Sequence, residues 1–535
     1  MIFYKNYRTT PKKEFVKMRV FPLIFLSLFA LTGCDNPTTS LTIVHTNDVH
    51  AHLLPSDLKL QDCEAGQANC YGGFARIKSV IDGIRESSEN TIVLDAGDRF
   101  SGTVFYTLNK SQDITPLTQQ MGYDVLTLGN HEFDDGLEEL DQFAQGISAP
   151  IVSANVSFPT YPTLNKRIVP SVILNKNGLK IGVIGALSEE TKVESAKAKD
   201  ADITAVIPAV QKEAQALTKQ GIKVLIALTH IGIEEDKKLA LAVPQLDVIV
   251  GAHTHTLLSN DTNETTAYGP YPIEISHETG DKTLIITSGI AGHHLGILNT
   301  TFDKKGRITT YAGDTVRLDD TVVPDEMMTQ KIALAQKGID KIINEPIINI
   351  TQDIHLTNHG RFCSESCYVG EFLTHMLKQF ATDADIALLN AGGIRAGMPS
   401  GQIAFKHIAS AYPFDSTGVL VKMTGQELKE YLTLGLKKYV PDDRTNAFLQ
   451  IAGGAYDFSS DTKTITNLTV AGNPIDNQKE YTVLIPSFLA EGGDGFPVKA
   501  VLKTYDLTIR DMIISAMKQS QKPIQSFENR IKKVK

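Results

Sequence analysis

The sequence predicts an α/β protein, and three observations predict it. A chain of 535 residues is too long for one hydrophobic core, so we expect two large domains or three smaller ones. From Ser40 onward, apolar strand-like runs alternate with helix-length amphipathic stretches. The runs are nearly continuous in Val, Ile and Leu, which is typical of a buried sheet covered by helices. Five of these runs end in Asp, Asn or His, at the sheet edge where open α/β folds place their sites.

The N-terminus is predicted to be a targeting segment. Four basic residues precede an uncharged run over residues 20–31, and the chain continues Leu31-Thr32-Gly33-Cys34. This order is typical of a secretory signal over residues 1–33, and the apolar run is too short to span a bilayer comfortably. The ending resembles a bacterial lipobox, which makes Cys34 the lipidated first residue of the mature chain. The alternative is an ordinary signal with a nearby cysteine. We expect an extracytoplasmic lipoprotein, held to a membrane in the bacterial periplasm or at the cell surface.

The other four cysteines form two local pairs, Cys63 with Cys70 and Cys363 with Cys367. In an oxidising compartment both pairs are predicted to be disulfides that close small loops. A zinc site is the alternative, but the pairs lie far apart and lack histidines at finger-like spacing. The net charge of −9 signals no surface for a nucleic-acid polymer.

The predicted elements divide the chain after the signal into three parts. Residues 40–322 hold strands at 41–50, 91–98, 126–134, 151–156, 180–187, 223–230 and 246–255, a helix over 71–85, and a β-rich stretch from 256. Residues 323–346 read as a polar amphipathic helix that connects two domains. Residues 347–525 form a second α/β unit, with strands at 385–395 and 481–487 and a helix near 425–438.

The strand ends supply candidate metal ligands. The set is Asp48, His50, Asp95, Asn130, His230, His253 and His255. Mixed oxygen and nitrogen ligands suit Zn²⁺, Mn²⁺ or Co²⁺ better than Ca²⁺. Seven ligands are too many for one tetrahedral ion, so we expect two ions that share one carboxylate. Any single histidine of the set could instead be a hydrogen-bonded structural residue.

Several motifs resemble the 5′-nucleotidase family of calcineurin-like metallophosphoesterases. In the first half these are HTNDVH (45–50), GGFAR (72–76), DAGD (95–98), GNHEFD (129–134), TH (229–230) and GAHTH (251–255). In the second half they are NAGGIR (390–395), YPF (412–414) and FLAEGGDGF (488–496). The resemblance implies an N-terminal β-sandwich flanked by helices in four αββα-like layers. A linker helix and a smaller α/β nucleotide-binding domain would follow.

The resemblance also implies roles for residues. One metal would take Asp48, His50, Asp95 and His255, and the other Asp95, Asn130, His230 and His253, with Asp95 bridging. His131 matches the family's catalytic histidine, and Asp134 matches the carboxylate that orients it. Phe414 and Phe488 match the two rings that sandwich the base, and Asp494 matches the ribose ligand. Arg395 matches an arginine facing ribose and phosphate, and Asn390 would lie near the base. Cys363 stands where the family often carries an arginine, which Arg361 could replace.

These assignments predict a two-metal phosphohydrolase that releases phosphate from nucleoside 5′-monophosphates. Nucleoside di- and triphosphates, UDP-sugars and dinucleotides are further expected substrates, in extracytoplasmic nucleotide salvage. One alternative on the same scaffold is a 2′,3′-cyclic nucleotide phosphodiesterase with 3′-nucleotidase activity. The other is a surface protein that binds nucleotides without catalysis.

Overall fold

A computed structural model describes residues 38–535, except 59, 64–66, 357–362, 364–366, 439–446, 521–528 and 535. Residues Thr38–Lys535 form one compact unit. The predicted signal, Cys34 and Arg361 lie outside the described residues. Among the helices that the structure describes, none combines the length and the apolar character needed to span a bilayer.

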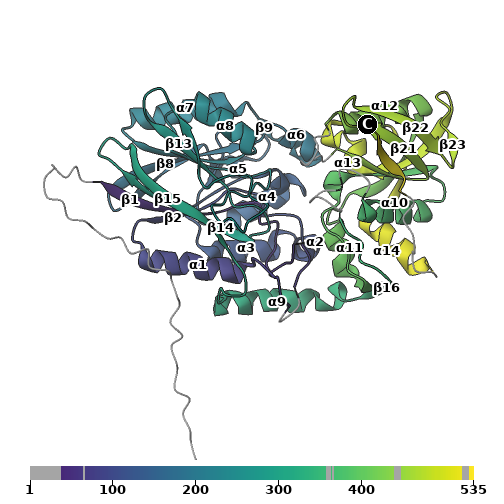
Figure 1. Cartoon of the computed structure of the whole chain (residues 1–535), viewed down its shortest axis with the longest axis horizontal. Coiled ribbons are helices and arrows are strands. Elements are labelled where there is room, and N and C mark those ends of the chain that lie inside the picture. Colours follow the sequence, from purple (N-terminus) through teal and green to yellow (C-terminus); the bar gives the residue numbers. More distant parts are fainter. Residues whose placement is uncertain are drawn as a thin grey trace, which may run out of the picture. The chain divides into compact units, whose positions relative to one another are not determined.

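The N-terminal domain is built on two sheets (Figure 1). The seven-stranded sheet has the order β15-β14-β1-β2-β3-β4-β6 and the six-stranded sheet the order β12-β13-β11-β10-β8-β7. The strands of the first sheet are β1 (Thr39–Thr46), β2 (Thr91–Asp95), β3 (Val125–Thr127), β4 (Ile151–Val152), β6 (Ile168–Val169), β14 (His294–Phe302) and β15 (Ile308–Arg317). Those of the second are β7 (Ser171–Lys176), β8 (Leu179–Leu187), β10 (Val224–His230), β11 (Val248–Val250), β12 (Ile273–Ser276) and β13 (Lys282–Ile286).

Alternation along the strands builds the layers. Ile43 of β1 packs into a core that also holds Val183 and Ile226 of the second sheet. The next residue, Val44, points to the opposite face and joins a core with Phe74 of α1 (Phe74–Ser87). Helices α3 (Ser111–Met121) and α4 (Leu137–Gly146) cover this same face, while α7 (Val206–Lys219) and α8 (Ile233–Ala242) cover the second sheet. The predicted four-layer αββα arrangement is confirmed.

Helix α9 (Glu326–Ile343) follows the N-terminal sheets, where the sequence predicts a connecting helix. The Asp325 carboxylate caps it by accepting from the Met328 N–H at 2.7 Å. Its buried residues, Met328, Ile332 and Ile339 among them, join the core beneath α1 and α3. α9 is therefore packed along the N-terminal domain.

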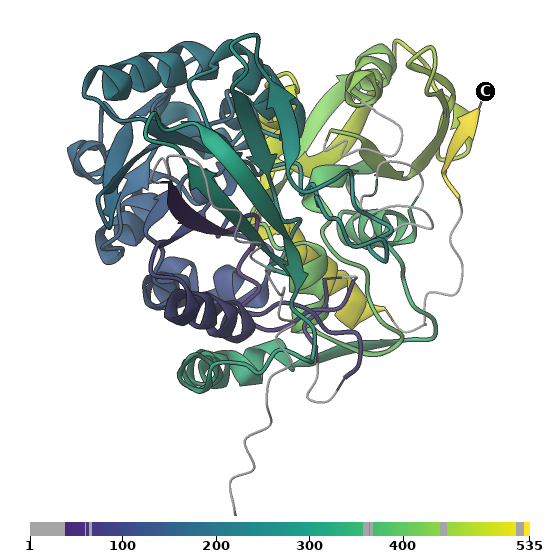
Figure 2. The same ribbon diagram turned by 60° about the vertical axis from the view of Figure 1, so that its left-hand side comes forward.

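The C-terminal domain has its own core and sheets (Figure 2, green to yellow). A five-stranded sheet has the order β20-β17-β24-β19-β25, and a four-stranded sheet the order β23-β22-β21-β26. The strands are β17 (Ile386–Asn390), β19 (Thr417–Thr424), β20 (Leu449–Ala452), β21 (Gly454–Ser459), β22 (Thr464–Val470), β23 (Asn473–Pro474), β24 (Glu480–Pro486), β25 (Val501–Thr508) and β26 (Ile531–Val534). A short pair joins β16 (Pro346–Ile350) to β18 (Gly401–Ala404). The helices are α10 (Tyr368–Phe380), α11 (Phe405–Ala411), α12 (Gly425–Lys437) and α14 (Ile509–Gln519).

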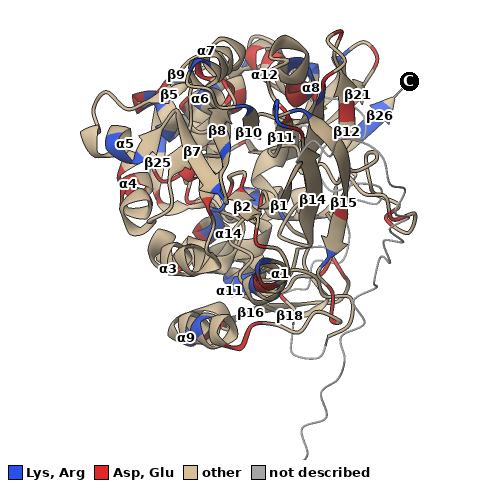
Figure 3. Cartoon of the chain, turned by 90° about the vertical axis from the view of Figure 1, so that its left-hand side faces the viewer, with Lys and Arg blue, Asp and Glu red and all other residues tan. Residues whose placement is uncertain are grey.

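Both predicted disulfides are confirmed. Cys63 and Cys70 are joined with a Cα–Cα distance of 6.2 Å, and Cys363 is joined to Cys367 at the start of α10. In the view of Figure 3, segments with Lys or Arg and segments with Asp or Glu are interspersed over the same helices and strands.

Candidate metal centre and adjoining cavity

The carboxyl ends of five strands bring the candidate ligands together. Strands β1, β2 and β3 run parallel in the first sheet, and β10 and β11 run parallel in the second. Asp48 and His50 follow β1, Asp98 follows β2, Asn130 follows β3, His230 ends β10, and His253 and His255 follow β11. All seven side chains are buried, none being more than 9% exposed.

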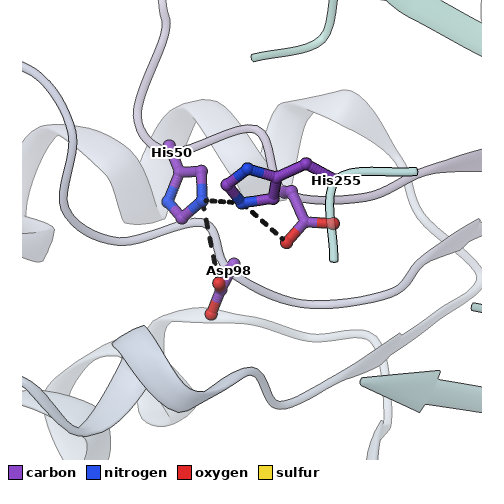
Figure 4. Close-up of side chains that lie close together, drawn as sticks. His50, Asp98 and His255 are labelled. Atoms are coloured by element: carbon purple, nitrogen blue, oxygen red, sulfur yellow. Dashed lines mark hydrogen bonds and ion pairs between the residues drawn. The ribbon is translucent and has the colours of Figure 1, made fainter. Parts of the chain in front are cut away.

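Four of these residues form one tight cluster (Figure 4). Ligand atoms of Asp48, His50, Asp98 and His255 all lie within 4.8 Å of one another. The His50 Nε2 atom is 3.0 Å from His255 Nε2 and 3.7 Å from an Asp98 oxygen. The His255 Nε2 atom is 3.5 Å from an Asp48 oxygen. Ring nitrogens and carboxylate oxygens thus converge on one point.

A second group adjoins the first through the same aspartate. The His230 Nε2 atom lies 3.2 Å from Asp98 Oδ2. Asn130 contacts His253, with 3.0 Å between Asn130 Oδ1 and His253 Nδ1. The predicted ligands, Asp95 excepted, are therefore gathered in two groups that meet at Asp98.

Asp95 is a correction to the sequence prediction. As the last residue of β2, it directs its carboxylate to Arg99, with 2.9 Å between Asp95 Oδ1 and Arg99 Nε. It also accepts from the Thr46 hydroxyl at 2.7 Å. Asp98 stands beyond the turn and reaches the cluster that Asp95 was expected to bridge. The signal was present in the sequence, because DAGD carries both aspartates.

Sequence analysis missed the supports of this turn, Glu132 and Arg99. The fully buried Glu132 carboxylate accepts from the backbone N–H groups of Asp98 (3.0 Å) and Arg99 (2.7 Å), and from Gly129. Arg99, 1% exposed, lies between Asp95 and Glu132, 3.4 Å from the latter. Buried charges need such paired partners. This network fixes the loop that carries Asp98.

The ligand loops also hold strained backbone. The φ angles of Asp48 (49°), His50 (46°), Asp98 (57°), His253 (84°) and His255 (53°) all lie in the left-handed region. Each non-glycine residue held there costs about 1–3 kcal/mol, and such strain clusters at functional sites.

The charge of the cluster fits a divalent cation. Asp98 Oδ2 and His230 Nε2 are buried atoms that lie 3.2 Å apart as an ion pair, and within the described part of the chain neither makes a hydrogen bond of regular geometry. Burial acts to raise the Asp98 pKa, but His230, His131 and His50 outweigh it and hold that pKa well below its usual value. Burial lowers the His230 pKa, but Asp98 and Asp48 raise it to about 10. The Asp98 and Asp48 carboxylates therefore favour a positive charge at the point where the histidine ring nitrogens of the cluster face one another, which is where a cation would bind.

His131 and Asp134 form the predicted dyad next to this centre. The His131 Nδ1 atom is 2.6 Å from Asp134 Oδ2, which also accepts from the Ser101 hydroxyl at 2.7 Å. Arg395 donates to His131 Nε2 at 3.0 Å. Because a guanidinium only donates, Nδ1 is the ring nitrogen that carries the hydrogen toward Asp134. The dyad and Arg395 thus come from opposite halves of the chain.

A cavity of about 170 Å³ opens beside the dyad. It is lined by Asn130, His131 and Asp134 of the first domain and by Asn390, Arg395, Phe414, Phe488 and Asp494 of the second. We call it the nucleoside cavity, after the ligand that the sequence motifs predict for it. The Phe414 ring lies 5.9 Å from the His131 ring, with 28° between their planes. The Asn390 amide donates to Asp494 at 2.7 Å, and burial raises the Asp494 pKa to about 7. Five predicted substrate residues therefore share one cavity.

The fold and the buried cluster define a metallophosphoesterase hydrolase, and comparisons with known proteins agree. The calcineurin-like phosphoesterase family matches residues 41–257, and the 5′-nucleotidase C-terminal domain family matches residues 347–500. The chain is 30% identical over 524 residues to the 5′-nucleotidase of Rattus norvegicus, covering 92% of this chain and 90% of that protein. It is 30% identical to an apyrase of Tabanus yao, covering 88% of this chain and 90% of that one. The crystal structure of a 5′-nucleotidase precursor from Thermus thermophilus superposes with a TM-score of 0.85 at 28% identity, over 93% of this chain and 99% of that one. The chain belongs to the 5′-nucleotidase family.

Proposed function

We propose that this protein is a two-metal phosphohydrolase that releases phosphate from nucleoside 5′-monophosphates. One observation carries the proposal: His131 contacts the metal-ligand cluster on one side and lines the nucleoside cavity on the other. The His131 Nε2 atom is 4.0 Å from Asp98 Oδ2 and 3.0 Å from Arg395 Nη2. A phosphate next to this ring would reach the cluster while its nucleoside remained in the cavity.

Two ligand sets would hold the two cations. The first comprises Asp48, His50, Asp98 and His255, and the second Asp98, Asn130, His230 and His253. Asp98 takes the shared position. When bound, Zn²⁺, Mn²⁺ or Co²⁺ in such a pair would supply a hydroxide near neutral pH and neutralise charge on the phosphoryl group.

His131 would handle the proton of the reaction. Asp134 fixes Nδ1, so Nε2 is the nitrogen that faces the phosphate position. Protonated at Nε2, the ring would donate to a phosphate oxygen or to the leaving 5′ oxygen. Arg395 would bind the same phosphate through its planar donors.

The nucleoside cavity would select nucleosides by shape and stacking rather than by base identity. Phe414 and Phe488 would stack on the base, which contributes about 1–3 kcal/mol per ring and tolerates every base. Asp494 would accept from the ribose hydroxyls, with Asn390 beside it. Such a pocket would also admit nucleoside di- and triphosphates, UDP-sugars and dinucleotides. Arg361 remains a proposed phosphate ligand on sequence grounds.

The location of this activity is also a proposal. Lipid on Cys34, after removal of residues 1–33, would hold the enzyme to a membrane on the extracytoplasmic side, in the bacterial periplasm or at the cell surface. The two disulfides support an oxidising compartment. Its role there would be nucleotide salvage.

The test is phosphate release by the full-length protein from AMP, with Zn²⁺, Mn²⁺ or Co²⁺ supplied in turn. We expect turnover that a chelator abolishes and that His131→Ala lowers by about 10²–10⁴-fold with metal content unchanged. Full activity of His131→Ala would remove its catalytic role. Preference for 2′,3′-cAMP over AMP would instead identify a cyclic phosphodiesterase, and metal binding without turnover would identify a binding protein.

A further inference from the structure

A second cavity borders the metal-ligand cluster. It measures about 430 Å³, against about 170 Å³ for the nucleoside cavity. His50 and His255 of the cluster line it, whereas Asn130 and His131 line the nucleoside cavity. The cluster therefore has a cavity on each of two sides, and we call the larger one the distal cavity.

Arg395 joins the two cavities. Its side chain lines both of them, and it donates to His131 Nε2 at 3.0 Å. A phosphate bound by Arg395 at the cluster would thus have an open space on each side. A nucleoside monophosphate fills only one of these spaces.

The walls of the distal cavity suit a sugar or a nucleoside. Leu257, Ile290, Leu356 and Ile394 supply apolar surface. Polar groups come from His294 and Arg317, which Glu264 fixes by accepting from Arg317 Nε at 2.6 Å and contacting His294 Nε2 at 2.8 Å. A mostly apolar lining with a few fixed polar groups is the usual character of a small-molecule site.

His52 adds a further polar group to the wall. It lines the distal cavity and is 2% exposed, and its Nδ1 atom makes no hydrogen bond within the described part of the chain.

We propose that the distal cavity binds the sugar or nucleoside on the second phosphate of a nucleoside pyrophosphate diester, while the first nucleoside occupies the nucleoside cavity. This proposal rests on the proposed function, and it assigns a place to a group that a monophosphate lacks. The phosphorus attacked is the one that carries the distal group. A bond forms between it and a water oxygen, and the bond to the bridging oxygen breaks. The nucleoside monophosphate leaves on that oxygen and receives a proton. NAD would give AMP and nicotinamide mononucleotide, and UDP-glucose would give UMP and glucose 1-phosphate.

The test uses a bulky substitution at the solvent-exposed edge of the distal cavity, which makes the cavity narrower. Thr265 lines this cavity, is exposed, and belongs to the surface loop between β11 and β12. We would compare wild-type protein with Thr265→Trp. The matched control is Thr262→Trp, because Thr262 is exposed in the same loop and does not line the cavity. For each full-length protein, kcat/KM is measured with NAD, UDP-glucose and AMP, and the nucleotide products are identified.

We expect Thr265→Trp to lower the kcat/KM ratio of NAD to AMP, and of UDP-glucose to AMP, by about ten-fold or more. Thr262→Trp should leave both ratios within about two-fold of wild type. Equal ratios in all three proteins, or wild-type protein that cleaves AMP but neither diester, would overturn the distal site while leaving the nucleotidase proposal intact.

The remaining outcomes separate the two proposals. If wild-type protein cleaves the diesters but not AMP, the nucleotidase proposal fails, and a ten-fold loss on NAD in Thr265→Trp alone would still support the distal site. If the protein is inert toward all three substrates, both proposals fall. A ten-fold loss confined to one diester would show that the cavity selects between a hexose and a nucleoside.

Discussion

Two aspartates three positions apart have different surroundings. Asp98 lies among His50, His230 and His255, whereas Asp95 pairs with Arg99 in the core. We expect Asp98→Asn to reduce bound metal and to lower activity by more than the roughly 10–100-fold that loss of a supporting residue costs. Metal content by elemental analysis and AMP hydrolysis measure this effect.

Asp95→Asn is the matched variant for comparison. Metal content should be retained, because Asp95 does not contact the cluster, but the buried Arg99 guanidinium loses the nearer of its two carboxylate partners. Breaking a buried pair from one side costs about 3–5 kcal/mol, and the remaining contact with Glu132 offsets part of that. The free energy of unfolding from urea denaturation gives the loss. Metal loss in Asp95→Asn with full metal in Asp98→Asn would restore the original assignment.

The sequence could not separate these two aspartates. DAGD places one carboxylate at the end of a strand and one after a turn, and either could face the ligands. The difference depends on Arg99 and Glu132. Arg99 pairs with Asp95 and with Glu132, so the Asp95 carboxylate stays in the core and away from the metal ligands. Charge pairing between residues 33 positions apart, as in Arg99 and Glu132, leaves no pattern in a single sequence. The other six ligand positions follow from strand ends alone.

Asp494 gives a pH dependence to nucleoside binding. Burial raises its pKa to about 7, so near pH 6 the carboxyl is mostly protonated and near pH 8 mostly ionised. The ionised form accepts from ribose hydroxyls, so the affinity for adenosine should increase with pH, by up to about ten-fold between pH 6 and 8. Isothermal titration calorimetry with adenosine, which carries no phosphate, isolates this site.

Asp494→Asn should remove that increase, because an amide does not titrate in this range. The contribution of Asp494 to folding stability has the opposite sign: a carboxyl whose folded pKa is raised loses its stabilising contribution as pH increases from about 4 to about 7. An adenosine affinity that still increases with pH in Asp494→Asn would assign the titration to another group.

At the scale of elements, one short turn controls the position of a ligand. A Cβ atom on Gly129 would lie 2.2 Å from Asp98 Oδ1 and 2.5 Å from the Asp98 backbone nitrogen. Both contacts are far below van der Waals distance, so Gly129→Ala must displace Asp98 or the loop that carries His131. We expect a loss of metal affinity and of AMP hydrolysis similar to that of Asp98→Asn.

Gly83→Ala is the control for a glycine replaced in a helix. Gly83 lies inside α1 with no atom near its Cβ position, so alanine should stabilise the protein by about 0.5–1 kcal/mol and leave activity unchanged. For both variants, Gly129→Ala and Gly83→Ala, we would measure the metal content and the midpoint of thermal unfolding. Wild-type activity in Gly129→Ala would show that the Asp98 loop adapts more freely than its contacts indicate.

Element positions were more predictable than element lengths. The run 126–134 was expected to be one strand, but β3 ends at Thr127 and a 3₁₀ turn covers Asn130–Phe133. Glu132 produces this difference, because its carboxylate accepts backbone N–H groups of the neighbouring loop instead of facing solvent. The nearly continuous apolar run at the start of 41–50, by contrast, correctly predicted a strand that is buried on both faces.

At the scale of the whole molecule, the sequence predicted two domains but not how they meet. Arg395 and His131 lie 264 residues apart and contact each other at 3.0 Å. Each was predicted by its own local motif. Their contact depends on the packing of many side chains between the domains, such as the Thr107 hydroxyl that donates to the Pro413 carbonyl at 3.3 Å. No local pattern encodes such a contact.

Lys110 forms the charged link between the two halves of the nucleoside cavity. It lies 3.2 Å from Asp135, which follows the dyad carboxylate Asp134, and it forms an ion pair with Asp415, which follows Phe414. Lys110→Met should therefore misplace the dyad loop against the stacking ring. Partly exposed ion pairs are worth about 0.2–1 kcal/mol each, so we expect kcat/KM for AMP to fall by about three- to ten-fold.

Comparing two substrates distinguishes misalignment of the two halves of the nucleoside cavity from general damage to the fold. Hydrolysis of p-nitrophenyl phosphate, which has no nucleoside to place on Phe414, should fall less than hydrolysis of AMP in Lys110→Met. Salt should lower AMP turnover in wild type and have little further effect in the variant, because screening acts on the ion pairs that the variant lacks. Lys238→Met, which removes an exposed helical pair with Glu235, is the control and should match wild type on both substrates. Equal losses on AMP and p-nitrophenyl phosphate would show that Lys110 supports the fold of the first domain and does not align the two halves of the site.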